Sequence, residues 1–209
     1  MIRATAQAWR LISLVALGAV AASSCAGVAG SSFNGKPVDV YSVIPSQADV
    51  RTVLGDSNWW AGPPTFGVLP LDDATTPTTV KFWVRQQFRH IGTAEELVVR
   101  YTVYDKASTA TSEMTSFQNA YGTSPSSPKV GDQVLYYGFH AGGAAPIVTR
   151  TFVRVGQIVI QIVWSRKDTI PLLDQLGKTA AKFTDGLKNL GRAHRSPKAV
   201  DATLLYALP

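Results

Sequence analysis

The chain has 209 residues, of which 45% are hydrophobic and 16% are charged, and its formal net charge is +6. This length suits one globular domain with accessory segments, and the composition excludes a chain that is disordered throughout. The basic residues are spread along the sequence without a dense Lys/Arg run, which argues against nucleic-acid binding and fits attraction to an anionic surface or ligand.

The first 24 residues have the layout of a secretory signal peptide. Arg3 and Arg10 give a positive start, an apolar run covers residues 11–20, and small residues follow at positions 21–24. The run is shorter than the roughly 20 apolar residues that a membrane span needs. We therefore expect residues 1–24 to be a signal peptide and the protein to be exported.

Cys25, the only cysteine, follows directly after these small residues. The stretch Ala22-Ser23-Ser24-Cys25 resembles a bacterial lipobox, in which the chain is cut before the cysteine and the thiol carries a diacylglycerol. The resemblance implies lipidation of Cys25 and a lipid anchor on the extracytoplasmic side of the cell membrane, where two or more acyl chains hold a protein stably. The alternative is an ordinary signal peptide that is cut near Ala22 or Ser24.

The first predicted element beyond the leader is a helix over residues 44–55. Ser46 can cap its N-terminus, Asp49 can return the bond three residues later, and Gly55 is placed to end the helix. A loop rich in glycine and proline is expected to follow over residues 56–79.

After this loop apolar and polar residues alternate, which is typical of a half-buried strand. The inward set is Val80, Phe82, Val84 and Phe88, and the outward set is Lys81, Trp83, Arg85 and Arg89. A break at residues 92–94 leads to a second strand over residues 97–104. We expect the two strands to pair as a hairpin.

A helix is predicted over residues 109–121, where apolar residues recur at helical spacing. Three strands are then expected, and Gly156 occupies the tight turn between the last two. They cover residues 134–139, 147–155 and 157–164. A final helix is predicted to begin near Asp168, with Pro171 in its first turn, and to end at Gly191.

The predicted order is α-β-β-α-β-β-β-α. Hairpin connections predict an antiparallel sheet of about five strands with helices packed mainly on one face, which is an α+β two-layer domain. The domain spans residues 41–191. We expect residues 25–40 to form a flexible tether, and residues 192–209 to be a loose tail or an extra edge strand.

Three segments carry a resemblance to a known family: residues 44–55 (IPSQADVRTVLG), 130–133 (VGDQ) and 152–160 (FVRVGQIVI). Together with the leader they resemble actinobacterial cell-envelope lipoproteins. The domain, over roughly residues 41–191, is similar to the extracellular sensor domain of mycobacterial Ser/Thr kinases of the PknH type. The resemblance implies a non-enzymatic module that binds a ligand or a partner, and it assigns no ligand residues. Kinase sensor domains of this type carry paired disulfides, whereas a single cysteine leaves stability to the core.

No motif predicts catalysis, a metal site or a cofactor. His90, His140 and His194 are never three or four residues from one another, so their spacing does not suit a metal site. The segment that begins at His140 looks like an esterase oxyanion loop, but the chain has no Gly-x-Ser-x-Gly elbow. The adjacent acidic pairs at residues 72–73 and 95–96 are typical of solvated turns. We therefore expect a protein that is not an enzyme.

Two groups of residues are candidates for ligand binding. Trp59 and Trp60 precede a proline-stiffened segment and could contact a sugar, a lipid or a protein, unless one or both cover the sheet edge as core. The outward side chains Trp83, Arg85 and Arg89, joined by Lys81 and Arg100, could meet phosphate head groups, anionic glycans or an acidic protein. The alternative is a solvated sheet face.

The leading functional hypothesis is an anchored extracytoplasmic lipoprotein whose domain binds an envelope ligand or a partner protein without chemistry. The second is carriage of a lipid or another hydrophobic small molecule in a cavity between sheet and helices. The residues expected to line such a cavity are Phe82, Tyr101, Phe117, Tyr121, Phe183 and Leu187, all of which also suit a plain core. An enzyme is the third class.

Overall fold

The computed structural model describes residues 35–67, 80–140, 146–167 and 169–190. The strands are β1 (Trp59–Ala61), β2 (Thr65–Gly67), β3 (Val80–His90), β4 (Glu96–Tyr104), β5 (Gln133–His140), β6 (Ile147–Val155) and β7 (Ile158–Arg166). The helices are α1 (Pro37–Tyr41), α2 (Gln47–Leu54), α3 (Ala107–Tyr121) and α4 (Leu173–Asp185), followed by a 3-10 turn, η1 (Gly186–Asn189). The expected signal peptide, Cys25 and the predicted tail at 192–209 lie outside the described residues. None of the described helices is long and apolar enough to cross a membrane.

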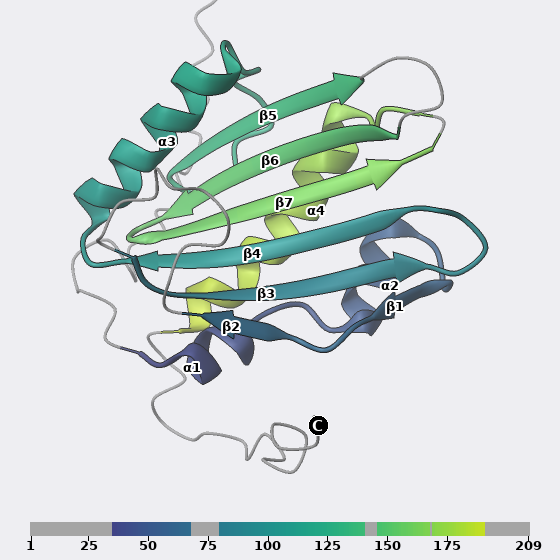
Figure 1. Ribbon diagram of the computed structural model, residues 1–209, viewed down its shortest axis with the longest axis horizontal. Helices are drawn as coiled ribbons and strands as arrows, with labels where there is room; N and C mark the ends of the chain where they lie inside the picture. Colours follow the sequence, from purple (N-terminus) through teal and green to yellow (C-terminus); the bar gives the residue numbers. More distant parts are fainter. Residues whose placement is uncertain (1–34, 68–79, 141–145, 168, 191–209) are drawn as a thin grey trace, which may run out of the picture.

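The strands form one antiparallel sheet in the order β1-β3-β4-β7-β6-β5, and β2 also pairs with β3 (Figure 1). Both expected hairpins are present: β3 pairs with β4, and β6 pairs with β7 through a turn at Gly156, whose φ is 57°. A glycine suits this turn because side-chain-bearing residues rarely adopt a positive φ. The predicted α+β class and the antiparallel sheet are confirmed.

The sheet has seven strands rather than the five that the sequence predicts. The two additional strands, β1 and β2, lie inside the stretch that we expected to be a loop. Each has three residues, and both pair with β3 on the side away from β4. β3 is 11 residues long, so its outer edge offers backbone groups along its length, and short segments with poor intrinsic strand preference can pair with it.

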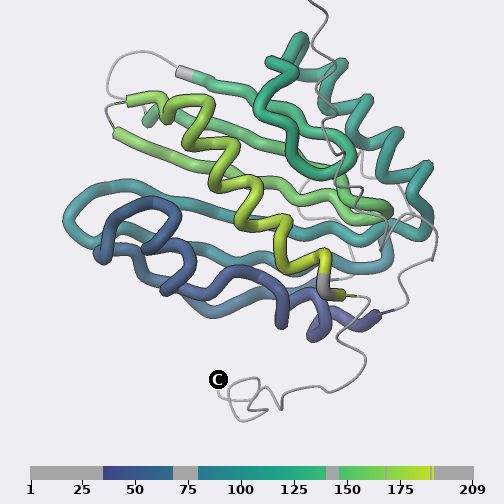
Figure 2. Tube along the Cα trace, turned by 180° about the vertical axis from the view of Figure 1, so that it is seen from behind, coloured from purple at the N-terminus to yellow at the C-terminus, as the bar shows by residue number. Residues whose placement is uncertain are grey.

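Three of the described helices lie on one face of the sheet and one lies on the other, so the helices are mainly on one face, as expected, but the predicted two layers are wrong. α1, α2 and α4 belong to one layer, and Figure 2 shows α4 running across the sheet beside α2. α3 lies on the opposite face and packs on β4, β5, β6 and β7. The residues between β4 and β5 therefore carry the chain to the other side of the sheet, and the domain has three layers.

Local sequence signals account for the ends of two helices. The side chain of Ser46 accepts a hydrogen bond from the Asp49 amide, the Asp49 carboxylate bonds the Ser46 amide at 3.0 Å, and Gly55 ends α2 with a φ of 68°, as predicted. α4 begins at Leu173, later than the expected start near Asp168. Pro171 contributes to the delay because a proline disfavours the helical conformation of the residue before it, and Leu172 is still extended.

The described part of the predicted tether contains α1. A proline at its start and Asp39, whose carboxylate accepts from the Lys36 amide at 2.6 Å, favour this short helix. Val40 is fully buried against the main core. The packed domain thus begins before residue 41.

Candidate functional site

The face of the sheet that carries α3 is only partly covered by described elements. α3 buries an apolar cluster over one end of β4, β7, β6 and β5. Its members are Tyr104, Ala110, Met114, Leu135, Tyr137, Phe152 and Val159. Figure 1 views the sheet from this side, and α3 runs along one end while the broad surface of β3, β4 and β7 faces the viewer.

Strand register places four arginines on this open surface. Arg85 lies directly opposite Arg100 across β3 and β4, and Arg89 lies opposite Glu96. Arg150 of β6 is in register with Val163 of β7. We call this surface the arginine face and define it by Arg85, Gln87, Arg89, Val98, Arg100, Arg150, Gln161 and Val163, most of which are half-buried.

The four arginines differ in how their charges are balanced. Arg89 is 3.9 Å from the carboxylate of Glu96, and Arg150 donates to the Tyr121 hydroxyl at 3.2 Å while its guanidinium lies 5.7 Å from the ring centre. Within the described ranges no acidic side chain forms an ion pair with Arg85. Two like charges directly opposite each other on a sheet repel, so the Arg85–Arg100 pair is by itself unfavourable for folding.

Glu113 of α3 brings a negative charge to one border of the arginine face. Burial raises its pKa, while a hydrogen bond with Tyr104 and the charge of Arg100 partly oppose that rise. Burial also raises the pKa of Tyr104. Glu113 is thus a half-buried carboxyl that balances part of the arginine charge at the place where α3 meets the sheet.

The candidate aromatic residues occupy different environments. Trp59 is only 2% exposed and packs edge-on against Trp164, so it is core, the alternative left open for this pair. Trp60 is 52% exposed, lies opposite Arg89 in the β1–β3 register, and has the guanidinium of Arg51 5.0 Å from its ring. Of the two tryptophans, only Trp60 can contact a ligand while β1 stays paired with β3.

Of the outward stripe predicted on β3, Trp83, Arg85 and Arg89 share one face. The alternation breaks at the register shift between Val80 and Phe82, where Lys81 lies, so Val80, predicted to face inward with Phe82, packs beneath α3 instead. Arg85 and Arg89 belong to the arginine face. Trp83 shares their side of the sheet but is only 7% exposed, and its indole lies against Gly67 of β2, where a side chain would overlap it. Trp83 therefore packs under the surface residues, and little of its ring is exposed to a ligand.

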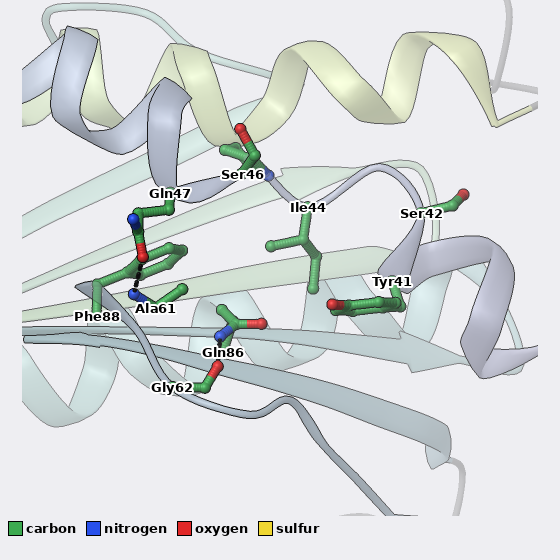
Figure 3. A pocket seen from close by; sticks show the side chains of 10 residues that line it. Tyr41, Ser42, Ile44, Ser46, Gln47, Ala61, Gly62, Gln86 and Phe88 are labelled. Atoms are coloured by element: carbon green, nitrogen blue, oxygen red, sulfur yellow. Dashed lines mark hydrogen bonds between the residues drawn. The ribbon is translucent and has the colours of Figure 1, made fainter. Parts of the chain in front are cut away.

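A pocket of about 340 Å³ lies on the other side of β3. Its walls come from the α1–α2 connection, the start of α2, the end of β1 and the middle of β3 (Figure 3). Gln86 lies on its floor, and Gln47 accepts a hydrogen bond from the Ala61 amide at 3.0 Å. No sequence pattern predicted this pocket, although Gln86 occupies an inward position of β3 between the buried Val84 and Phe88.

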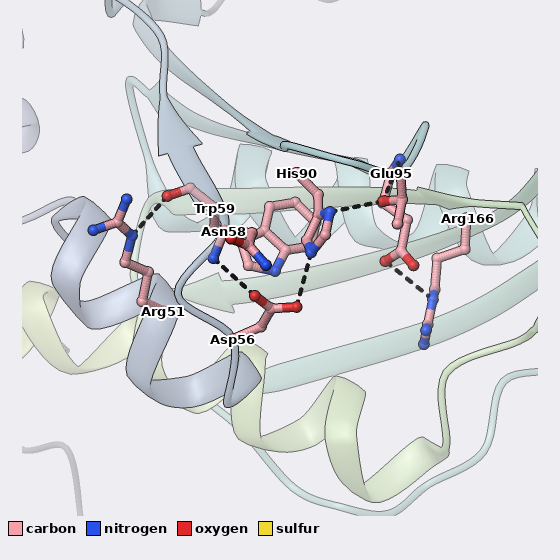
Figure 4. A network of polar contacts seen from close by, with 8 residues as sticks. Arg51, Asp56, Asn58, Trp59, His90, Glu95 and Arg166 are labelled. Carbon is pink, nitrogen blue, oxygen red and sulfur yellow. Dashed lines mark hydrogen bonds and ion pairs between the residues drawn. The ribbon is translucent and has the colours of Figure 1, made fainter.

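A polar network closes the end of the sheet near β1. His90 contacts the Asp56 carboxylate through Nε2 at 2.8 Å and the Thr93 hydroxyl through Nδ1 at 2.9 Å. Figure 4 shows Asp56 between His90 and the amide of Asn58, and the hydrogen bonds from Asn58 and His90 lower the pKa of Asp56. The Thr93 hydroxyl also accepts from the Glu95 amide at 3.3 Å.

This order of hydroxyl, imidazole and carboxylate is the order found in a nucleophilic triad. Here the Thr93 hydroxyl is engaged in the β3–β4 turn, and Asp56 is engaged in the turn before β1. The network therefore joins two turns and fixes His90 against the ring of Trp59, 5.4 Å away. In the described parts of the chain, no group of three or more His, Cys, Asp or Glu side chains is placed to hold a metal ion.

The residues proposed to line a lipid cavity do not surround one space. Four of them are buried in the core beneath α4: Phe82, Tyr101, Phe183 and Leu187. Phe117 and Tyr121 instead pack in the cluster beneath α3, on the opposite face of the sheet. The sheet separates the two groups, so these six residues cannot form a single carrier cavity.

Comparison with known proteins finds the fold but no sequence relative. No protein family and no curated protein matches the sequence. The crystal structure of the extracellular domain of PknH from Mycobacterium tuberculosis is similar, with a TM-score of 0.58 and 12% sequence identity, over 76% of this chain and 100% of that one. The resemblance to the PknH-type extracellular domain that the sequence predicts is thereby confirmed at the level of the fold.

Two of the segments that carry this resemblance contact each other. The carboxylate of Asp132 accepts from the Gly156 amide at 2.7 Å and pairs with Arg154 at 3.1 Å. Gly131 has a φ of 64°, and a side chain there would overlap the Arg154 carbonyl. The two segments thus hold the start of β5 against the β6–β7 turn. Their role is structural, which agrees with a resemblance that concerns the fold and assigns no ligand residue.

Proposed function

We propose that this protein is a membrane-anchored extracytoplasmic binding module, without catalytic function, whose arginine face binds an acidic surface of a partner protein. The observation that carries the proposal is the open part of the sheet, where Arg85 and Arg100 face each other on neighbouring strands. Glu113 balances part of this charge in the free domain, and carboxylates of a partner that approach both guanidinium groups would balance the rest.

The chemistry of the arginine face favours a protein partner. Val98 and Val163 lie next to each other in its middle, between Gln87 on β3 and Arg150 on β6. A flat surface with an apolar centre, arginines around it and no lysine matches the composition of protein–protein interfaces. The exposed ring of Trp60 at the outer edge adds a residue type that often contributes strongly to binding.

The location of the module rests on the leader and on Cys25. A signal peptide would export the domain, and a lipid on Cys25 would keep it near the outer face of the membrane. The fold is shared with a domain that is extracellular in PknH, which fits this placement. Mass spectrometry of the mature N-terminus, compared between the native protein and a Cys25→Ala variant, tests the anchor. An unmodified thiol at the mature N-terminus would contradict it.

Site-specific photo-crosslinking in the native cells tests the binding face. A photoreactive phenylalanine at Gln87, on the arginine face, should give a crosslinked species of defined mass. The same amino acid at Gln175, on α4 behind the sheet, serves as the control position. We expect the crosslink from position 87 to disappear in an Arg85→Glu/Arg89→Glu variant and to persist in Lys178→Glu/Lys188→Glu, which changes the net charge equally on the α4 side.

Two results would overturn the proposed binding face. One is a crosslink from position 87 that survives both charge reversals with equal yield. The other is the same species captured equally well from position 175. Crosslinking to phospholipid instead of protein would show that the arginine face meets the membrane surface, and it would replace the partner protein in the proposal.

A further inference from the structure

We propose that the pocket between α2 and β3 is a binding site for a neutral saccharide unit. It is separate from the arginine face because Gln86, on its floor, points to the α4 side of β3, whereas Arg85 and Gln87 point to the other side. A cavity of about 340 Å³ is within the size range of small-molecule sites in proteins.

The strongest observation is the side chain of Gln86. It is only 4% exposed and stands in a row of core side chains, between Val84 and Phe88 on β3. Its amide nitrogen donates to the carbonyl of Gly62 and, at 3.5 Å, to that of Gln87. Among the described residues none donates to its oxygen, and Figure 3 shows this oxygen turned from Gly62 toward the side where Tyr41 lies.

This oxygen is not one of the buried atoms that lack a partner, so it opens into the pocket, where water can meet it and a ligand hydroxyl can replace that water. The backbone contact of its nitrogen fixes the orientation of the Gln86 side chain, so the oxygen cannot turn away from the pocket without losing that bond. The geometry therefore provides a fixed acceptor that awaits a donor from a molecule in the pocket.

The second polar group is Gln47, the first residue of α2. Its oxygen accepts from the Ala61 amide, and its side-chain nitrogen is a donor at the wall of the pocket. The two glutamines thus present one acceptor and one donor from opposite walls. A sugar hydroxyl can donate to the first and accept from the second, and neighbouring hydroxyls on a ring allow both at once.

The rest of the lining selects against charge and favours a ring with an apolar side. None of the described side chains that line this pocket is charged, so an ionic ligand would lose hydration without gaining a counter-ion from them. Tyr41 and Phe88 supply aromatic surface, and Ile44 supplies aliphatic surface. Aromatic rings pack against the C–H side of a sugar while the hydroxyl groups reach the amides.

The experiment is a titration of the full mature protein followed by NMR of the glutamine side-chain amides. The probes are glucose, galactose and N-acetylglucosamine, with glucuronate and glucosamine as charged counterparts of the same size. We expect at least one neutral sugar to give saturable shifts of the Gln47 and Gln86 amide signals. The charged counterparts should bind at least about ten-fold more weakly.

Gln86→Met removes the acceptor while keeping the length of the side chain, and it should weaken binding of the same sugar at least about ten-fold. Gln157→Met is the matched control because Gln157 is also buried and also donates to a backbone carbonyl, that of Tyr104 at 2.9 Å. Should Gln86→Met fail to fold, Gln47→Met, at the half-buried start of α2, tests the donor in its place.

Three results would overturn this assignment. They are the absence of saturable shifts with every neutral sugar, equal binding of the charged counterparts, and unchanged affinity in the Gln47 or Gln86 variant. The first would leave the pocket as a water-filled cleft. Because the arginine face is on the other side of β3, the crosslinking result is independent of this one, and either proposal can fail without the other.

Discussion

The two faces of the sheet differ in what covers them and in what their residues do. On the α4 side, α1, α2 and α4 close a continuous apolar core. On the α3 side one helix covers one end of the strands, and the remaining surface carries the arginine face. Along β3 the division changes with every residue: Val84 is fully buried and its neighbour Arg85 is on the open surface.

The comparison shows that, on the same strands, the residues that form the core and the residues proposed to bind a partner point to opposite faces of the sheet. Substitutions on the open face change charge with little effect on the core, because alternate side chains of a strand point to opposite faces. Three buried polar residues of the strands lie on the closed face, Gln86, Thr149 and Thr151, where packing alone would favour apolar ones. Gln86 differs from the two threonines because it lies at the wall of a pocket.

The largest effect is expected from truncating the helices of the two layers at matched positions. Phe183 of α4 is fully buried and meets Phe88 edge-on, with ring centres 6.1 Å apart. Phe117 of α3 is half-buried and stacks on Phe152 at 4.0 Å. Phe183→Ala should lower the free energy of unfolding by about 3 to 5 kcal/mol, and Phe117→Ala by about half as much.

Chemical denaturation of both variants, with equal m-values, measures this difference. If Phe117→Ala is at least as costly as Phe183→Ala, then α3 rather than α4 anchors the domain. The division into a stability face and a binding face would then be wrong.

The next effect concerns the contact between α4 and the segment after α1. Gly186, at the end of α4, is so close to Val43 that a methyl group would overlap the Val43 carbonyl oxygen. In an open helix, glycine to alanine is favourable by up to about 1 kcal/mol. Gly186→Ala should instead destabilise by about 1 to 3 kcal/mol because the added atom meets rigid backbone. A rise in Tm of this variant would show that α1 and α4 are less closely packed than the structure indicates.

A smaller difference in the free energy of unfolding is expected between the removal of two buried tyrosine hydroxyls. Tyr101 donates to the Phe183 carbonyl at 2.7 Å in the closed layer, and Tyr137 donates to the Gly122 carbonyl at 3.1 Å beneath α3. Tyr101→Phe should cost about 1 to 2 kcal/mol, and Tyr137→Phe about 0.5 kcal/mol, because a fully buried hydrogen bond has no water to replace it. Equal losses in thermal or urea unfolding would contradict the contrast between the layers.

Local signals made part of this fold predictable. The capping pair Ser46 and Asp49 and the turn residue Gly156 act over a few neighbouring residues, so the sequence alone could place a helix and a hairpin there. β1 and β2 could not be predicted in this way. They are strands because β3 offers them an edge, and this depends on residues that follow them in the chain.

The candidate sites were predictable to different degrees. Alternation placed Arg85 and Arg89 on one face correctly, but it could not show that Arg100 is directly opposite Arg85, which depends on the register of the hairpin. The pocket joins residues 41–47, 61–62 and 86–88, and no local pattern connects them. One signal was available: Gln86 interrupts the inward apolar positions of β3, and a buried polar residue in a core position marks a specific hydrogen-bonding role.

The smallest expected effect is a pH response of opposite sign in the two layers. The hydrogen bond from Lys182 of α4, followed by that of Ser46, lowers the pKa of Asp49 on the closed side. Burial raises the pKa of Glu113 on the open side. The stability that Asp49 contributes is therefore present above its unfolded-state pKa and lost as the pH falls through the folded value. That of Glu113 is present below its unfolded-state pKa and lost as the pH rises through the folded value.

At pH 7, Asp49→Asn should lower the Tm and Glu113→Gln should raise it, each by about 1 to 3 °C. Both differences from the native protein should shrink as the pH is lowered, first for Glu113, whose folded pKa is raised, and only at lower pH for Asp49, whose folded pKa is lowered. Thermal unfolding monitored by circular dichroism between pH 3 and 8 measures both. A fall in Tm for Glu113→Gln at pH 7 would mean that the contacts with Arg100 and Tyr104 outweigh burial. The ionised Glu113 carboxylate would then stabilise the folded domain at pH 7 instead of destabilising it.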